Sequence, residues 1–193
     1  RGVLVNDGIE VTVICPGPAG PGGRLREGVH VYHYPKPALG GGFAAHLAEY
    51  AVSLFFHTLL TLWVAVRHGF DVIHVANPPD LLWLVAAPYR LIGKRFIFDH
   101  HDLVPELFEV RFREKAPRVL TVVRWLERMS MSLADHVICT NETFRNFALT
   151  RGGRDGRDVT VVRNGPWLSR DFPPRAAVPV VHGVGDPLLV GYV

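Results

Sequence analysis

The chain has 193 residues, of which 48% are hydrophobic and 20% are charged. This composition is typical of a folded globular protein and excludes a disordered one. Much of the surplus behind the formal net charge of +3 is arginine between Arg145 and Arg175. Gly and Asp residues interrupt these arginines, which favours a solvated face over a specific anion site, and we expect no nucleic-acid partner.

The two cysteines and the first residues indicate the compartment. Cys15 and Cys139 each lie in an apolar run without the spacing of a metal or redox site, as buried thiols of a reducing compartment do. The start of the chain shows no secretory signal, so we expect a cytoplasmic protein. Because the chain opens with Arg1 and its first residues resemble the end of a helix, we expect a fragment that lacks its own beginning.

Apolar runs rich in β-branched residues alternate with helical stretches. The first half of the pattern predicts strands at 10–15 and 29–34, a helix at 43–68 that Gly69 ends, a strand at 71–76 and a helix at 80–92. The second half predicts a strand at 95–99, a helix at 118–134, a strand at 136–140, a helix at 142–150 and a strand at 159–163. This alternation predicts an α/β fold, a Rossmann-like parallel sheet with helices on both faces.

The longest predicted helix contains the apolar segment 51–66, AVSLFFHTLLTLWVAV, which has no Asp, Glu, Lys or Arg. Its 16 residues fall short of the roughly 20 that a membrane span needs, and His57 lies near its middle. We therefore expect this helix to be buried against the sheet and a neighbouring helix. Some exposure is expected near 43–49, where an acceptor that carries a lipid could dock.

The composition changes after Pro166. Residues 1–166 form the first predicted domain, and the Pro-, Arg- and Gly-rich stretch 167–187 is a predicted linker. The apolar segment 188–193, LLVGYV, has nothing after it with which to form a sheet. We interpret it as the first strand of a second, truncated domain.

Polar residues collect directly after four of the predicted strands, at the sheet edge where ligands bind in parallel α/β folds. The candidate substrate-binding residues there are Asn77, Asp99, His100, Asp102, Glu106, Asn141, Glu142, Arg163, Asn164 and Gly165. Loop or cap chemistry is the alternative for any one of them, because Asn141 and Asp80 would also make good helix N-caps.

The run Asp99-His100-His101-Asp102 is the strongest single feature. An imidazole can donate a hydrogen bond to a hydroxyl or phosphate oxygen and titrates near neutral pH. Consecutive residues leaving a strand point to alternate sides, so at most one of the two histidines should face a cleft. The alternatives are a structural role, with Asp102 capping a turn, or a metal site that also uses His74. Adjacent histidines rarely coordinate one ion, so we expect no bound metal.

The glycine-rich segment 17–23, GPAGPGG, follows a strand as a phosphate-binding loop would. Its glycines are not in G-x-G-x-x-G register, its prolines lack an N–H, and no helix begins directly after it. We therefore expect no phosphate site there.

Four segments together resemble the acceptor-side domain of glycosyltransferase family 4: DVIHVANPPDLL (71–82), RFIFDHHDLVPELFE (95–109), ADHVICTNETFRNFALTRGG (134–153) and VTVVRNGP (159–166). The likeness begins with NDGIEVTVICP (6–16) and continues to LLVGYV, so it covers essentially the whole chain. That family uses the GT-B fold, in which two Rossmann-like domains face each other across a cleft. The resemblance implies that this chain is the N-terminal half of such an enzyme.

The resemblance also implies a function. It implies a retaining glycosyltransferase of the hexosyltransferase type, without a cofactor, that moves a sugar from a nucleotide-sugar donor to an acceptor hydroxyl. The acceptor would be a carbohydrate or a lipid-linked molecule in polysaccharide or glycolipid assembly, which allows contact with the inner face of a membrane. The family's acceptor-domain histidine maps onto His101, with His100 as the fallback, and Asp102 is expected to hold the ring.

Two parts of the family pattern are missing. The first strand and its Gly-rich loop would precede Arg1, and the paired glutamates of the other domain would follow residue 193. Glu106 and Glu114 imitate the spacing of that pair but lie in the wrong domain. We therefore expect this fragment alone to be inactive. The alternatives are a metal-dependent hydrolase that uses the Asp99–Asp102 cluster and a GT-B-like domain used only for binding.

Overall fold

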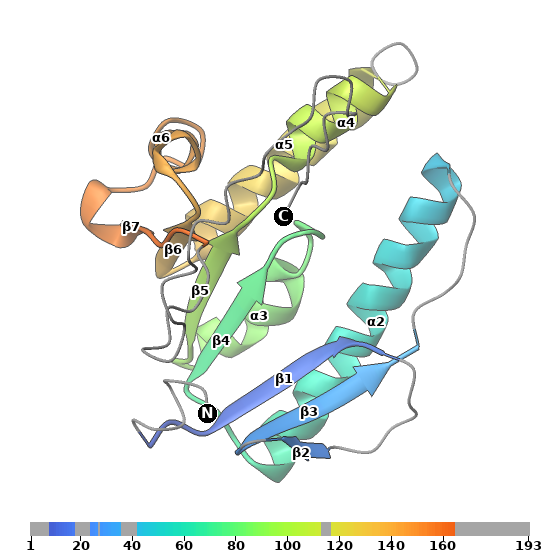
Figure 1. Ribbon diagram of the computed structural model, residues 1–193, viewed down its shortest axis with the longest axis vertical. Helices are drawn as coiled ribbons and strands as arrows, with labels where there is room; N and C mark the ends of the chain where they lie inside the picture. The colour runs from blue at the N-terminus through green and yellow to red at the C-terminus, as the bar shows by residue number, and fades with distance from the viewer. Residues whose placement is uncertain (1–7, 18–23, 27, 36–41, 113–116, 165–193) are drawn as a thin grey trace, which may run out of the picture. The chain divides into compact units, whose positions relative to one another are not determined.

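The computed structural model describes residues 8–17, 24–26, 28–35, 42–112 and 117–164. The chain divides into two compact units, residues 1–163 and 164–193. The helices and strands in Figure 1 all belong to the first unit. The predicted linker, the predicted strand at 188–193 and most of the glycine-rich segment 17–23 lie outside the described residues.

The larger sheet has four strands in the order β4 (Val72–Ala76), β5 (Arg95–His100), β6 (His136–Cys139) and β7 (Val159–Val161). Each strand pairs in parallel with its neighbour. The prediction that these four strands lie side by side and point the same way is therefore confirmed. Their carboxyl ends form one edge, which we call the carboxyl edge.

Helices connect the strands of this sheet. They are α3 (Trp83–Leu91), α4 (Val104–Phe112), α5 (Pro117–Leu133) and α6 (Glu142–Thr150), followed by the short 3₁₀ helix η1 (Gly156–Asp158). The sequence pattern did not predict α4 or η1. Helix α3 begins at Trp83 rather than at Asp80, because the Asp80 carboxylate accepts a hydrogen bond from Asn77 instead of capping the helix.

The smaller sheet has three strands in the order β1 (Val11–Pro16), β3 (Val29–Tyr34) and β2 (Arg24–Arg26). β1 is parallel to β3, whereas the unpredicted β2 is antiparallel to it. The long helix α2 (Phe43–Arg67) follows. It ends as predicted, because Gly69 takes the left-handed conformation with φ +71° and its N–H donates to the carbonyl of Val64.

The two sheets do not pair with each other among the described strands, so the strands form a four-stranded parallel sheet and a separate three-stranded one. β1 and β4 lie on either side of a cavity of about 1210 Å³ and point the same way (Figure 1). Consecutive residues of both strands line it, and Val13 and Val72 are 38% and 47% exposed. The cavity thus separates two strand edges that each have a partner on one side only.

The main core lies under the larger sheet. Phe96, Phe98, Met131 and Val137 are fully or almost fully buried and belong to one hydrophobic cluster. Because β5 and β6 supply three of these side chains, the loops that leave them start from rigid strands.

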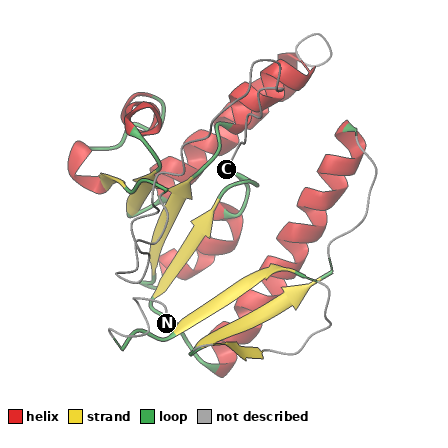
Figure 2. Cartoon of the chain, viewed as in Figure 1, coloured by secondary structure: helices red, strands yellow, loops and turns green. Residues whose placement is uncertain are grey.

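Only one side of α2 is buried. Ser53, Thr61 and Val64 are covered, whereas Leu59 and Trp63 are 52% and 46% exposed. Figure 2 shows the helix lying against the smaller sheet with one side. The prediction that a neighbouring helix covers much of the other side is therefore wrong.

Candidate functional site

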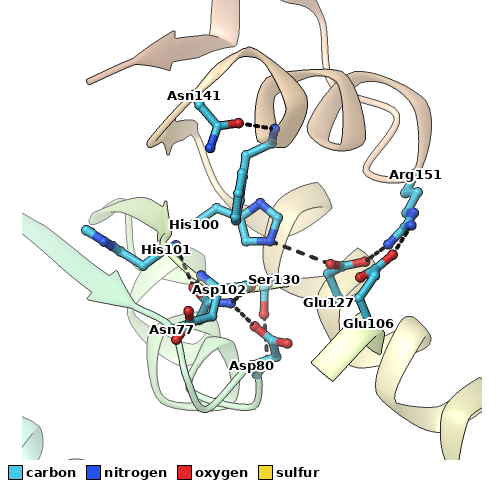
Figure 3. A network of polar contacts seen from close by, with 11 residues as sticks. Asn77, Asp80, His100, His101, Asp102, Glu106, Glu127, Ser130, Asn141 and Arg151 are labelled. Carbon is cyan, nitrogen blue, oxygen red and sulfur yellow. Dashed lines mark hydrogen bonds and ion pairs between the residues drawn. The ribbon is translucent and has the colours of Figure 1, made fainter. Parts of the chain in front are cut away.

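The side chain of Asn77, directly after β4, holds the loop that follows β5 (Figure 3). Its Oδ1 accepts hydrogen bonds from the backbone N–H groups of His101 (2.7 Å) and Asp102 (3.1 Å). Its Nδ2 donates to the Asp102 carbonyl (2.7 Å) and to Asp80 Oδ1 (2.9 Å). These bonds use the whole hydrogen-bonding capacity of the amide, and Asn77 is 4% exposed. Asn77 therefore positions the loop in this structure, and its predicted contact with a substrate stays a prediction.

His101 lies at the carboxyl edge with its side chain 36% exposed. Its Nε2 is 3.1 Å from Asp99 Oδ1, and the Nε2 of His74 on β4 is 3.1 Å from Asp99 Oδ2. The carboxylate that holds the ring is therefore that of Asp99 rather than the predicted Asp102, whose backbone is bound to Asn77. Burial raises the pKa of Asp99, but the hydrogen bonds from His74 and His101 outweigh burial and hold this pKa below its usual value.

His100 points to the opposite side, as the alternation along a strand predicts (Figure 3). Its side chain is fully buried, stacks on Phe98 and meets the edge of Phe144, with ring centroids 5.7 and 5.1 Å apart. Its Nε2 lies 3.5 Å from Oε1 of the buried Glu127. No part of the ring is accessible in this structure, so His100 packs in the core, and its predicted contact with a substrate stays a prediction.

A chain of charged groups continues from Glu127. Arg151, the C-cap residue of α6, lies 3.3 Å from Glu127 Oε2 and also pairs with Glu106 on α4. Burial raises the pKa of Glu106, but the hydrogen bond from Arg151 outweighs it and lowers this pKa overall. The predicted substrate ligand Glu106 is thus engaged in joining α4 to α5 and α6. Glu127 and Arg151 carried no local signal, because their partners are 24 and 45 residues away.

Asp80 is 3% exposed and lies below the same loop. The Ser130 hydroxyl donates to its backbone carbonyl at 2.6 Å. Burial raises the pKa of the Asp80 carboxyl to about 7, the hydrogen bond from Asn77 opposes this rise, and the charges of Glu127 and Asp102 add to it. This carboxyl therefore changes charge near neutral pH, directly beside the residue that holds the His101 loop.

Helix α2 carries Tyr50, which the sequence did not single out. Burial raises the pKa of its phenol, and the charges of Asp80 and Asp102 raise it further. The phenol therefore stays protonated at neutral pH.

The remaining candidates lie after β6 and β7. Asn141 caps α6 as predicted, because its Oδ1 accepts from the Phe144 N–H at 3.0 Å. Glu142, Arg163 and Asn164 are exposed and accessible to a ligand. Gly165 lies outside the described residues.

No three His, Cys, Asp or Glu side chains of the described residues converge as ligands for a metal ion. The Asp99–Asp102 run does not converge on one point, because His100 is buried against Glu127 and Asp99 is shared between His74 and His101. This part of the chain therefore offers no support for a metal-dependent hydrolase.

Comparisons with known proteins agree with the fold. Residues 3–165 match the model of the glycosyl transferase 4-like domain. The structure is similar to sucrose-phosphate synthase from Thermosynechococcus elongatus, with a TM-score of 0.62 and 14% sequence identity. The match covers 84% of this chain and 40% of that one, and at this identity it shows the fold alone, a Rossmann-like half of GT-B architecture. With its α/β fold and a family match over most of its length, the chain belongs to the glycosyl transferase 4-like family.

Proposed function

We propose that this chain is the acceptor-side domain of a retaining glycosyltransferase of the hexosyltransferase type. The complete enzyme transfers a sugar from a nucleotide-sugar donor to an acceptor hydroxyl in polysaccharide or glycolipid assembly. It works in the cytoplasm, at the inner face of the membrane when its acceptor is lipid-linked. Residues 1–166 form this domain, and 167–187 connect it to a nucleotide-sugar-binding domain that begins with 188–193.

One observation carries the proposal. His101 is accessible at the carboxyl edge while its ring and its backbone are both held in place, by Asp99 and Asn77 respectively. With Nε2 donating to Asp99, the Nδ1 of the neutral ring is an acceptor, and protonation turns it into a donor. An imidazole fixed in this way can serve a sugar hydroxyl or the departing phosphate without reorganising during the reaction.

Other exposed groups at the edge support binding of a polar ligand. Arg163 supplies a guanidinium, which suits phosphate oxygens, and Glu142 supplies a carboxylate, which suits sugar hydroxyls. Both lie beyond the ends of parallel strands, where ligands of open α/β sheets bind.

The test uses the complete protein with uridine, guanosine and adenosine diphosphate sugars and a carbohydrate acceptor. We expect release of nucleoside diphosphate that depends on the acceptor, that persists with a metal chelator, and that gives a product with the anomeric configuration of the donor by NMR. An inverted product refutes the retaining mechanism. Hydrolysis that a chelator abolishes refutes the transferase in favour of a metal-dependent hydrolase.

A further inference from the structure

The side of α2 that faces away from the sheet is apolar along most of its length. Its large side chains are 52% to 82% exposed, and we call them the apolar face: Leu47, Phe55, Leu59, Leu62 and Val66. Trp63 lies at the margin of this face, because its ring meets the edge of Tyr32 on β3 with centroids 5.1 Å apart. With the exposed Ala51 and Thr58 between them, they recur at helical spacing and form one stripe, about 28 Å long.

The opposite side of α2, which packs on the sheet, carries polar as well as apolar side chains: Val64 is 4% exposed, and Phe56 stacks on Tyr34 with ring centroids 5.5 Å apart. Ser53 and Thr61 are 7% and 8% exposed. The Ser53 hydroxyl hydrogen-bonds to the hydroxyl of Tyr34 on β3 at 3.1 Å, and His57 Nδ1 bonds to the Ser53 carbonyl at 2.8 Å. A helix on the surface of a water-soluble protein turns polar and charged side chains outward, whereas α2 turns apolar side chains outward as well as inward. The outer side of α2 therefore suits an apolar medium better than water.

The apolar face also lacks groups for polar contact with a partner. Between Glu49 and Arg67 the sequence has no Asp, Glu, Lys or Arg. Thr58 has a hydroxyl on this side, and it donates to the carbonyl of Leu54 at 2.8 Å, so it is already satisfied. Protein interfaces have a polar rim and regular hydrogen bonds, which this stripe does not offer. Contact with the hydrocarbon of a bilayer needs neither a polar rim nor hydrogen bonds.

The carboxyl end of α2 adjoins a basic, partly apolar turn. The Phe70 ring, just beyond α2, packs against Tyr89 of α3 with centroids 5.1 Å apart. The turn after α3 exposes Leu91 and Ile92, which are 89% and 70% exposed. We define the basic end as the four cationic side chains in this region, Arg67, Arg90, Lys94 and Arg95.

The basic end has a surplus of positive charge. Asp71 pairs with Lys94 and Asp135 with Arg90. Four cations against two carboxylates leave a surplus of two positive charges beside exposed leucine and isoleucine side chains. Apolar side chains flanked by cations match a surface of hydrocarbon under anionic headgroups.

We propose that the apolar face of α2 docks on an anionic lipid bilayer, with the helix lying in the plane of the interface and the basic end among the headgroups. The helix cannot span the bilayer in this arrangement, because its opposite side is packed on the smaller sheet. A transferase docked in this way meets an acceptor that is anchored in the same bilayer. The statement about the acceptor rests on the proposed function, whereas the statement that the chain docks on a bilayer rests on the described surface alone.

The test is flotation of residues 1–193 with vesicles of phosphatidylcholine alone or of an equimolar mixture with phosphatidylglycerol. We expect binding to the mixed vesicles to be about tenfold stronger or more, because of the two surplus charges, and salt should weaken it. Phe55→Glu combined with Leu59→Glu should lower this binding more than about tenfold. Arg67→Glu with Arg95→Glu should remove the preference for anionic vesicles.

The matched control is Leu107→Glu combined with Val110→Glu on α4, which adds the same two charges at apolar residues that are 57% and 86% exposed and outside the apolar face. It should bind vesicles as the unchanged chain does, and circular dichroism should show every variant folded. Absence of vesicle binding by the folded chain overturns the proposal, and so does an equal loss in the control. Self-association that the α2 variant abolishes, without vesicle binding, assigns the face to a second copy and also overturns it.

The bilayer inference and the proposed function can each fail without the other. In the complete protein, the Phe55→Glu/Leu59→Glu variant should transfer sugar to a water-soluble acceptor at the unchanged rate. If transfer occurs but vesicles are not bound, only the bilayer inference fails. If vesicles are bound but no sugar is transferred, the proposed function fails and the docking surface stands.

Discussion

His100 and His101 are neighbours with opposite surroundings. His100 is packed between Phe98 and Phe144 and faces a buried carboxylate, whereas His101 is accessible above Asp99. Removing the first ring leaves a cavity in the core, and removing the second leaves the core intact. The two residues should therefore separate stability from catalysis.

We expect His101→Ala in the complete protein to lower kcat on the order of a hundredfold, because it removes a positioned polar group from the donor sugar. Its Tm should stay close to that of the parent. His100→Ala should instead lower Tm strongly. Steady-state kinetics and thermal denaturation of both variants check this pair, and the reversed pattern would move the catalytic role to His100. If neither variant slows turnover by about tenfold, the histidine assignment is wrong.

Asp80 gives stability a distinct pH dependence. Its pKa rises from 3.8 to about 7 on folding, so between these values the native state keeps a proton that the unfolded state releases. The contribution of Asp80 to the free energy of unfolding is fully present at the acid end of this pH range and is lost as the pH rises to 7. His57 opposes it in part, because burial lowers the pKa of this imidazole and its contribution is lost as the pH falls.

Asp80→Asn keeps an acceptor for the Asn77 amide but cannot ionise. Relative to the parent, the variant should gain on the order of 4 kcal/mol of unfolding free energy between about pH 4 and pH 8. Urea denaturation of both proteins across this range measures the difference directly, and the contribution of His57 cancels. A difference that does not change with pH would show that Asp80 does not titrate in this window.

The residue-scale features that the sequence predicted are local ones. Alternation along β5 separates His101 from His100, and the position of Asn141 before a helix identifies a cap. The contacts it missed join distant parts of the chain. Arg151 pairs with Glu106, which is 45 residues away in the sequence, and no periodic sequence pattern predicts such a pair.

At the scale of elements, the order β4-β5-β6-β7 was predictable because each strand is an apolar run with a polar ending. The orientation of α2 was not predictable in the same way. Its segment is apolar all round except for a few small polar side chains, and only the contact of Ser53 with Tyr34 shows that they point inward. From the absence of charged residues we therefore predicted that this helix is buried, whereas its apolar side is exposed in the structure.

The cavity between β1 and β4 lies between two strand edges. Among the described strands, each of these two has a partner on one side only, and both point the same way and line the cavity with consecutive residues. A further strand seated there would pair with both edges and join the two sheets.

Hydrogen exchange tests this expectation. Backbone amides of β1 and β4 should exchange much more slowly in a complete protein than in residues 1–193, because a strand between them supplies acceptors and excludes water. Amides of β6, which already lies between β5 and β7, serve as the internal control and should be protected in both. Equal exchange of β1 and β4 in the two proteins would contradict a strand between these edges.

At the scale of the whole molecule, the proposed function makes this chain one half of a two-domain enzyme. The chain spans 40% of the sucrose-phosphate synthase chain with which it shares a fold. Its accessible candidate groups lie along one sheet edge, and within the described residues only a few of them, such as His101, Glu142 and Arg163, are exposed enough to meet a donor. A second domain is therefore expected to supply most contacts to the nucleotide.

Titration calorimetry of the isolated and the complete protein with the same panel of nucleotide sugars tests the half-enzyme account most directly. Residues 1–193 should bind every donor weakly or not at all, with Kd in about the millimolar range, whereas the complete protein should bind one donor in about the micromolar range. Micromolar binding by residues 1–193 alone, or no binding by either protein, would contradict the account.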